Sequence, residues 1–321
     1  MPLESNLGLQ RPSKFSAKTR LSGPHAGRES CTAEGMAEQR TPGDFDEVLC
    51  LPEQPLIVGG QAVNIWADFY SEIDARLEAL KPFVSKDADV FGDRAMAERL
   101  AAASKWRLTC YYEPRSVGLA MLTKELPNSE RLTVEIISSV NGLTPKELAD
   151  PDIIQLRTGK IYRLPSPIVL LKAKLANVAQ IDQSRRQDVR HVRMLIPCTR
   201  EYLRGSHVDT LAGRMSGRDL VNLFEAARSL CLEARNAELG RKHDFNLADV
   251  FPMEFSHSPI VKVARFYENR MTGLSRTIDP DSPSQEQSRT KAVRLMLESM
   301  ISPSAIDKDR EKTKGPEIEM D

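Results

Sequence analysis

The stretch Leu56-Ile57-Val58-Gly59-Gly60 decides the fold prediction for this chain. Its three apolar residues predict a short buried strand, and the two glycines mark a turn. The segment 61–80 then carries apolar residues at positions 62, 65, 66, 69, 73, 77 and 80, which is the spacing of one helix face. Together these features predict a strand, a glycine turn and a helix.

A helix that begins after two glycines is a candidate phosphate site. The first N–H groups of a helix have no partner within it, and its dipole is positive at that end. Gly59 and Gly60 would let phosphate oxygens approach the backbone. The alternative is a tight strand-to-helix turn without a ligand, which is the commoner reason for such a pair.

Two carboxylates follow in Ser85-Lys86-Asp87-Ala88-Asp89. Apolar residues on both sides predict a strand over residues 83–91, in which Asp87 and Asp89 point to the same face. Such a pair repels unless a divalent cation lies between its members, and hard oxygen ligands suit Mg²⁺. The alternative is an exposed strand edge, although a charged pair is costly to bury without a partner.

A third carboxylate, Glu135, interrupts the β-branched run of residues 132–138. Taken alone it is more typical of a surface position on an edge strand. Further strands are predicted at residues 106–112 and 117–122, and a hairpin at 153–157 and 160–164 around Thr158-Gly159. Asp93 is expected to cap a helix that runs to about residue 105, and Thr144 with Glu147 is expected to start a short helix.

After Pro165 the pattern becomes helical, with predicted helices at residues 167–181, 185–204, 217–239 and 285–301. We therefore expect an α/β (α+β) fold in which a small mixed sheet is followed by helices. The predicted organisation is a disordered arm at 1–45, an α/β domain at 46–165, a helical domain at 166–301 and a flexible tail at 302–321.

Composition narrows the class of protein without naming it. The 321 residues include 45 basic and 45 acidic side chains, so the net charge gives no indication for a nucleic-acid partner, and any basic patch must be local. No stretch approaches the roughly 20 apolar residues of a membrane span, and we expect no membrane partner. Five scattered cysteines without CxxC spacing suit a reducing compartment, so a cytoplasmic location is expected.

The ordered set of motifs resembles the polymerase-β nucleotidyltransferase superfamily. Strand-Gly59-Gly60-helix, Asp87-x-Asp89 and the later carboxylate Glu135 follow the family's order. The closest likeness is to bacterial minimal nucleotidyltransferases that include abortive-infection toxins. The segments 170–175 and 186–189 resemble their lysine helix and following Arg-x-Asp helix, so the likeness covers about residues 56–200. One departure is Glu135, where the family usually has Asp.

The resemblance implies an Mg²⁺- or Mn²⁺-dependent enzyme that transfers a nucleoside monophosphate from an NTP to a hydroxyl of an RNA or protein acceptor, releasing pyrophosphate. The implied metal ligands and catalytic residues are Asp87, Asp89 and Glu135. The implied NTP-binding residues are Gly59, Gly60, Ser85, Lys174 and Arg186, with Lys172 as the alternative lysine. The other possibility is a catalytically silent member that acts as a binding or regulatory module, of the toxin–antitoxin or defence type.

Two features of residues 185–204 each allow two interpretations. Arg186, Arg190, Arg193, Arg200 and Arg204 recur on one helix face and could guide a polyanionic acceptor. The alternative is a solvated face with acidic neighbours, and Pro197 is expected to kink or split the helix. Asp188 and His191 have helical i, i+3 spacing, for which a surface hydrogen bond is the simpler interpretation than a metal pair.

Overall fold

A seven-stranded mixed sheet forms the centre of the protein in a computed structural model that describes residues 39–113, 116–127, 129–271 and 274. The strand order is β3-β4-β5-β2-β1-β7-β6. The bounds are β1 (Leu56–Val58), β2 (Ala88–Phe91), β3 (Arg107–Cys110), β4 (Gly118–Glu125), β5 (Arg131–Ile137), β6 (Asp152–Gln155) and β7 (Ile161–Leu164). The predicted mixed α/β character is confirmed.

The pairing of the strands brings distant motifs together. Strand β2 lies between β1, to which it is antiparallel, and β5, to which it is parallel. Strand β4 is antiparallel to both β3 and β5. Strands β6 and β7 form the predicted hairpin, with Gly159 at φ +80° in its turn. The Gly59-Gly60 turn after β1, the Asp87-x-Asp89 motif at β2 and Glu135 in β5 therefore meet on three adjacent strands.

Alternating burial identifies the two faces of the central strands. In β5, Leu132, Val134 and Ile136 are buried, whereas the residues between them are half-buried. In β2, Ala88 and Val90 are buried in the same way. Because side chains alternate along a strand, one face of the sheet joins the main core and the other carries the polar residues of these strands.

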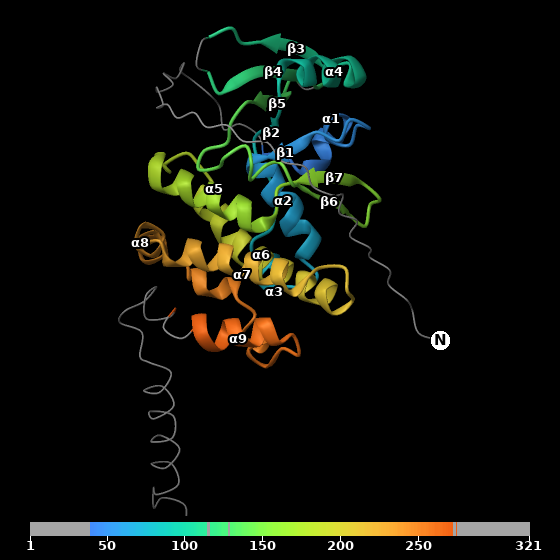
Figure 1. Cartoon of the computed structure of the whole chain (residues 1–321). Coiled ribbons are helices and arrows are strands. Elements are labelled where there is room, and N and C mark those ends of the chain that lie inside the picture. The colour runs from blue at the N-terminus through green and yellow to red at the C-terminus, as the bar shows by residue number, and fades with distance from the viewer. Residues whose placement is uncertain (1–38, 114–115, 128, 272–273, 275–321) are drawn as a thin grey trace, which may run out of the picture.

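Helices lie mainly to one side of the sheet, with α9 farthest from it (Figure 1). Their bounds are α1 (Asp46–Leu49), α2 (Gly59–Tyr70), α3 (Ala75–Glu78), α4 (Arg94–Ser104), α5 (Pro167–Gln180), α6 (Asp188–Leu211), α7 (Gly217–Leu232), α8 (Ala234–His243) and α9 (Val261–Arg270), with 3-10 turns η1 (Pro42–Phe45), η2 (Leu247–Val250) and η3 (Met253–His257). Within the described residues, none of these helices combines the length and apolarity that crossing a bilayer requires.

One hydrophobic cluster joins the sheet to the helices that follow it. Trp66 of α2 marks the junction, because its indole N–H donates to the Pro165 carbonyl at 2.9 Å. Its ring stacks on Tyr70 and meets Tyr202 of α6 edge-on. The cluster continues through α6 to Phe224 of α7. The residues before and after position 166 therefore contribute to one shared core.

Several local predictions need correction. The helix expected over 61–80 ends at Tyr70, and Asp74 starts α3 by accepting a hydrogen bond from the Arg76 amide. Thr144 does bond to the Glu147 carboxylate, but the segment is a turn and not a helix. Helix α6 continues through Pro197 as one helix and is not split there. Residues 217–239 form two helices, because the chain is extended at Glu233.

The folded part begins before residue 46. Arg40 and Ser85 exchange backbone hydrogen bonds of 2.8 and 2.9 Å, and Phe45 is fully buried. Residues 40–45, which the sequence predicts to be part of the disordered arm, therefore pack against the sheet. The rest of the expected arm up to residue 38, the expected helix at 285–301 and the expected tail at 302–321 lie outside the described residues.

Candidate functional site

Gly59 brings the backbone directly against Asp89. Val58 pairs with Asp89 across the antiparallel β1–β2 ladder. A Cβ atom placed on Gly59 would lie 2.0 Å from Asp89 Oδ2. Gly59 also has φ +69°, in the left-handed region that disfavours other residues. The glycine is thus required both by its backbone angle and by the carboxylate above it.

Asp89 and Glu135 are partners across the parallel β2–β5 ladder. Both are half-buried and point to the less buried face, since their strand neighbours face the core. Partners on adjacent strands lie about 5 Å apart. Asp87 differs from the prediction, because β2 begins at Ala88 and Asp87 lies in the bend before it. Its position next to the pair therefore depends on the turn as well as on the strand.

The surroundings of the three carboxylates change the pKa of one of them, Asp89. Burial, followed by the negative charges of Asp87 and Glu135, raises the pKa of Asp89 to about 7. The positive charges of Lys174 and Arg186 partly offset this rise. Like charges that crowd a carboxylate disfavour its ionised form. Burial and the two neighbouring negative charges therefore both disfavour the ionised Asp89 carboxylate, and a bound cation would stabilise it.

Ser85 and His191 approach Gly60 from outside helix α2. A Cβ atom placed on Gly60 would lie 2.5 Å from Ser85 Oγ and 3.2 Å from His191 Cε1. The Ser85 amide donates to the Arg40 carbonyl, so only the hydroxyl of Ser85 is left to bind a ligand. The predicted cradle of Gly59, Gly60 and Ser85 is thus brought together, without the Ser85 N–H.

Lys174 and Arg186 meet on a carboxylate of α6. Lys174 Nζ lies 2.8 Å from Asp188 Oδ1, and Arg186 Nε lies 2.6 Å from Oδ2. Asn177 also donates to Oδ1. Burial alone would raise the pKa of Asp188, but the charges and hydrogen bonds of Lys174 and Arg186 outweigh it and hold the pKa well below its usual range.

The two lysines of α5 have different surroundings. Lys174 is 5% exposed, whereas Lys172 is half-buried and pairs with Glu147 in the loop after β5. Lys174 is the one that influences Asp89, in line with the preference for it over Lys172. Asp188 and His191 are both buried, so the expected surface hydrogen bond between them was the wrong interpretation.

Most of the arginine row has structural partners. Arg190 donates to the carbonyls of Leu80 and Pro82, and Arg193 to that of His243. Arg200 pairs with Asp74, and Arg204 pairs with Glu201 and Glu254. These contacts with the protein's own carbonyls and carboxylates argue against a continuous track for a polyanion along the row. Arg186 is the member that lies by the carboxylates.

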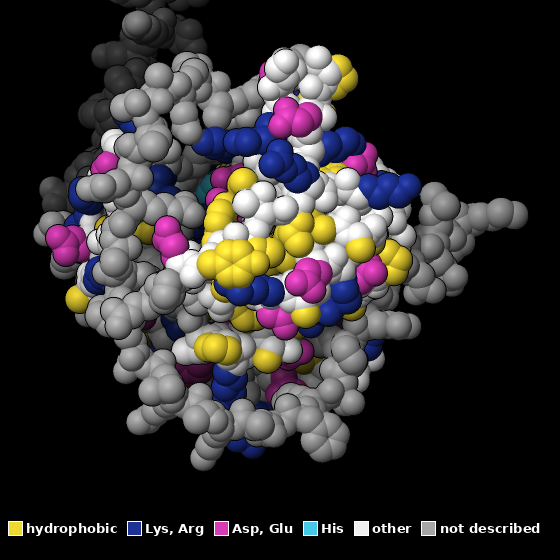
Figure 2. All heavy atoms as spheres, turned by 90° about the horizontal axis from the view of Figure 1, so that it is seen from above, with side chains coloured by type: hydrophobic (Ala, Val, Ile, Leu, Met, Phe, Trp, Pro, Cys, Tyr) yellow, Lys and Arg dark blue, Asp and Glu magenta, His cyan; other side chains and the backbone are white. Residues whose placement is uncertain are grey.

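Another cationic area lies at the β3–β4 end of the sheet. Viewed from above, Lys and Arg side chains border a group of hydrophobic ones (Figure 2). The exposed Tyr112 belongs to this end, and the Arg94 guanidinium lies 4.6 Å from its ring centroid. None of the predicted site residues belongs to α4, β3 or β4.

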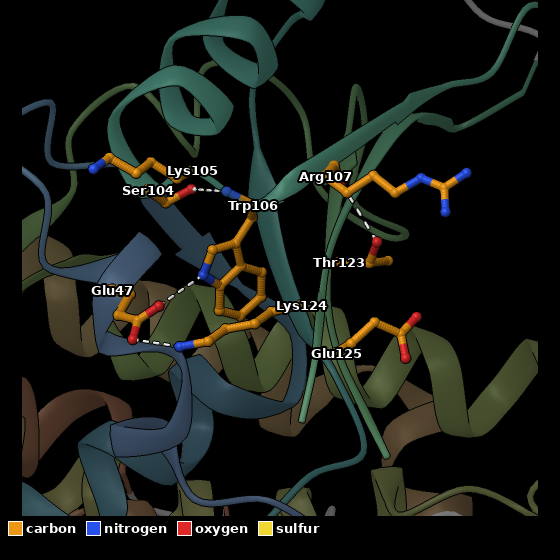
Figure 3. A pocket seen from close by; sticks show the side chains of 8 residues that line it. All are labelled: Glu47, Ser104, Lys105, Trp106, Arg107, Thr123, Lys124 and Glu125. Carbon is orange, nitrogen blue, oxygen red and sulfur yellow. Dashed lines mark hydrogen bonds and ion pairs between the residues drawn. The ribbon is translucent and has the colours of Figure 1, made fainter. Parts of the chain in front are cut away.

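A pocket near the same end also lies apart from the carboxylates. It is lined by residues of α1, α4, β3 and β4 (Figure 3). Several of its polar groups bind one another, since Glu47 accepts hydrogen bonds from Trp106 Nε1 at 2.9 Å and Lys124 Nζ at 2.5 Å. Thr123 bonds to the Arg107 carbonyl. We assign no role to this pocket.

The metal prediction can be compared with the geometry directly. In the described part of the chain, no group of three or more His, Cys, Asp or Glu side chains is arranged so that it could hold a metal ion. Asp87, Asp89 and Glu135 are therefore neighbours in charge and register, but not a formed three-ligand site. The raised pKa of Asp89 is the observation that fits a cation at this position.

Sequence reasoning missed two members of the site. Asn177 is one helical turn beyond Lys174 and binds the same carboxylate, which the i, i+3 spacing could have suggested. The sequence spacing suggests His191 only as a partner of Asp188. Its approach to Gly60 depends on how α6 crosses α2, and nothing in the local pattern indicates that crossing.

Comparisons with known proteins identify no family: no family model matches the chain, and no curated protein matches its sequence. The function is therefore inferred from the arrangement of the site.

Replacing Gly59 by Ala is expected to destabilise the protein by about 2–4 kcal/mol. The new Cβ needs a strained φ and displaces the Asp89 carboxylate. Gly159→Ala is the matched control, because Gly159 has φ +80° and nothing within 4 Å of an added Cβ. It should lose only about 1–2 kcal/mol. Urea unfolding of both variants measures the difference, and equal losses would mean that Asp89 does not constrain Gly59.

Proposed function

We propose that this protein is a nucleotidyltransferase. It transfers a nucleoside monophosphate from an NTP to an acceptor hydroxyl and releases pyrophosphate. The observation that carries the proposal is the register of Asp89 against Glu135 on one side and Val58 on the other, with Gly59 lying directly against the Asp89 carboxylate. This register puts carboxylates beside the start of a helix, so that metal ligands and phosphate-binding amides would be neighbours.

The carboxylates Asp87, Asp89 and Glu135 would hold Mg²⁺ or Mn²⁺. When bound, the metal supplies charge stabilisation to the attacking and leaving oxygens of the transfer. The raised pKa of Asp89 supports this role, because a cation would restore its ionised form at neutral pH. Glu135 is the carboxylate from the neighbouring strand and is suited to accept the proton of the acceptor hydroxyl.

Gly59, Gly60 and the Ser85 hydroxyl would hold the triphosphate at the start of α2. In this arrangement the acceptor oxygen forms a bond to the α-phosphorus, the bond to the pyrophosphate oxygen breaks, and the acceptor proton goes to Glu135. Arg186 has a partly exposed side chain next to the carboxylates and can neutralise phosphate charge. Lys174 is paired with Asp188, so we propose that it orients this region and contributes positive charge from behind.

RNA and protein hydroxyls are both candidate acceptors. The arginines of the row that lie in α6, from Arg190 to Arg204, bind other groups of the protein. This removes the main reason for preferring RNA as the acceptor. A protein acceptor is therefore at least as well supported as an RNA acceptor. Incubation with each labelled NTP, Mg²⁺ and either RNA or cell protein distinguishes the two by where the label goes.

Calorimetry of NTP binding with and without Mg²⁺ tests the proposal. We expect binding to need the metal, because the carboxylates repel the triphosphate until a cation neutralises them. Binding without transfer to any acceptor would support the silent binding module instead. If no NTP binds in either condition, the site is not a nucleotide site and the proposal fails.

A further inference from the structure

His191 is buried without a hydrogen-bond partner. His191 is 4% exposed, and neither of its ring nitrogens, Nδ1 or Nε2, has a partner among the described residues. A buried polar atom without a partner destabilises a protein by about 1–3 kcal/mol. Such groups are rare in folded proteins and are found where a ligand or water completes the hydrogen bond. The imidazole is therefore a group that lacks its partner.

The nitrogen-bearing edge of the ring faces the start of α2. The His191 atom nearest to the Cβ position of Gly60 is Cε1, at 3.2 Å, and Cε1 is bonded to both ring nitrogens. The Ser85 hydroxyl lies against the same position. Both nitrogens thus flank the ring atom that points to the proposed phosphate-binding turn. The helix start and the unpartnered side chain are independent observations that indicate the same ligand position.

The surroundings of His191 keep its ring neutral. Burial, followed by the positive charge of Lys174, holds the pKa of His191 well below its ordinary value. Asp188 opposes this effect, whereas Arg190 and Arg186 add to it. A neutral imidazole has one N–H donor and one acceptor nitrogen. Phosphoryl oxygens only accept hydrogen bonds, so the N–H is the atom available to them.

We propose that His191 binds the polyphosphate of the nucleotide, by donating one ring N–H to a phosphoryl oxygen held at Gly59-Gly60. The inference rests on the proposed nucleotide site and adds to it a neutral donor beneath the helix start. His191 would thus distinguish ligands by their phosphates and not by their base or sugar.

Inorganic tripolyphosphate with Mg²⁺ is the probe, measured by calorimetry on the full chain. His191→Leu removes both nitrogens and should weaken binding about 10- to 100-fold, the range for a hydrogen bond to a charged group. His191→Gln retains a donor amide and should bind within about threefold of the parent. Equal weakening by both variants, or no weakening by either, overturns the inference.

Thermal stability separates this role from a structural one. If the ring lacks its partner in the free protein, His191→Leu should melt at the same temperature or higher, since an unpaired polar group is removed. A structural histidine would instead lower the melting temperature when replaced. A variant that both binds tripolyphosphate normally and loses stability therefore contradicts the inference.

Asp89→Asn, tested in parallel, distinguishes failure of the inference from failure of the proposed function. Weaker binding in Asp89→Asn together with normal binding in His191→Leu would overturn only the role of His191. Normal binding in both would overturn the nucleotide site itself. Ring ¹⁵N chemical shifts provide a direct readout, because the donor nitrogen of His191 should shift when tripolyphosphate binds and should not shift in Asp89→Asn.

Discussion

Asp89→Asn is expected to lower nucleotide transfer by about 1,000-fold or more, which corresponds to several kcal/mol of lost transition-state stabilisation. The amide cannot replace a carboxylate as a ligand for Mg²⁺ between Asp87 and Glu135. Asp93→Asn is the matched control. Asp93 accepts a hydrogen bond from the Met96 amide as the cap of α4, and Asn caps a helix equally well. Transfer of labelled NTP to acceptor measures both variants.

The same variant should be more stable than the parent at neutral pH without metal. The folded-state pKa of Asp89 is about 7, above the unfolded value of about 4. The folded parent therefore binds a proton more tightly, and its stability falls as the pH rises from about 4 to about 7. Asn does not ionise, so the variant escapes this loss, by about 1–4 kcal/mol at pH 8.

Urea unfolding at pH 4 and pH 8, with and without Mg²⁺, tests this prediction. The two proteins should differ little at pH 4 and most at pH 8, and Mg²⁺ should stabilise the parent more than the variant. Parallel pH profiles would show that folding does not raise the pKa of Asp89. Full transfer activity in Asp89→Asn would remove it from the catalytic site.

Lys174→Met is expected to destabilise the protein by about 3 kcal/mol. The variant leaves the Asp188 carboxylate, which is 2% exposed, without the ammonium that lies 2.8 Å from it. Breaking a buried ion pair on one side costs about 3–5 kcal/mol. Arg186 and Asn177 continue to bind Asp188, which favours the lower end of that range.

Lys172→Met on the same helix is the control. Its partner Glu147 is in a loop, and both side chains are partly exposed, so the loss should be at most about 1 kcal/mol. Urea unfolding at pH 7 compares the variants. Equal losses would mean that the Lys174–Asp188 pair is as solvated as the surface pair. The double variant Lys174→Met/Asp188→Leu should recover stability, because no buried charge is left unpaired.

The local pattern was sufficient for most of the sheet. Residues 131–137 alternate in burial as their sequence alternates in polarity, so the face of Glu135 could be predicted from the strand alone. The Asp93 cap and the Gly159 turn were predictable for the same reason, since each depends on a few neighbouring residues. Asp87 was placed less well, because a strand start depends on partners that the local pattern does not show.

Tertiary structure decided which groups share the site. Asp188 and His191 are polar i, i+3 neighbours that the sequence suggests as a surface pair. Both are buried because α6 packs against α2 and α5. The sequence spacing predicts one charged face for the arginines of α6, but they bind different parts of the chain, from Leu80 to Glu254. Arg40 reaches Ser85 in the same way, over 45 residues of sequence.

The sequence by itself therefore determined the strands, the faces of their side chains, and the glycine turn against which a carboxylate could pack. Those features follow from periods of two or 3.6 residues and from the backbone freedom of glycine, which act over a few positions. Which charges neutralise each other, and which imidazole lies beneath Gly60, followed only from the crossing of helices and the order of strands. Contacts of that kind join residues far apart in the chain, and their energies depend on burial that no local pattern contains.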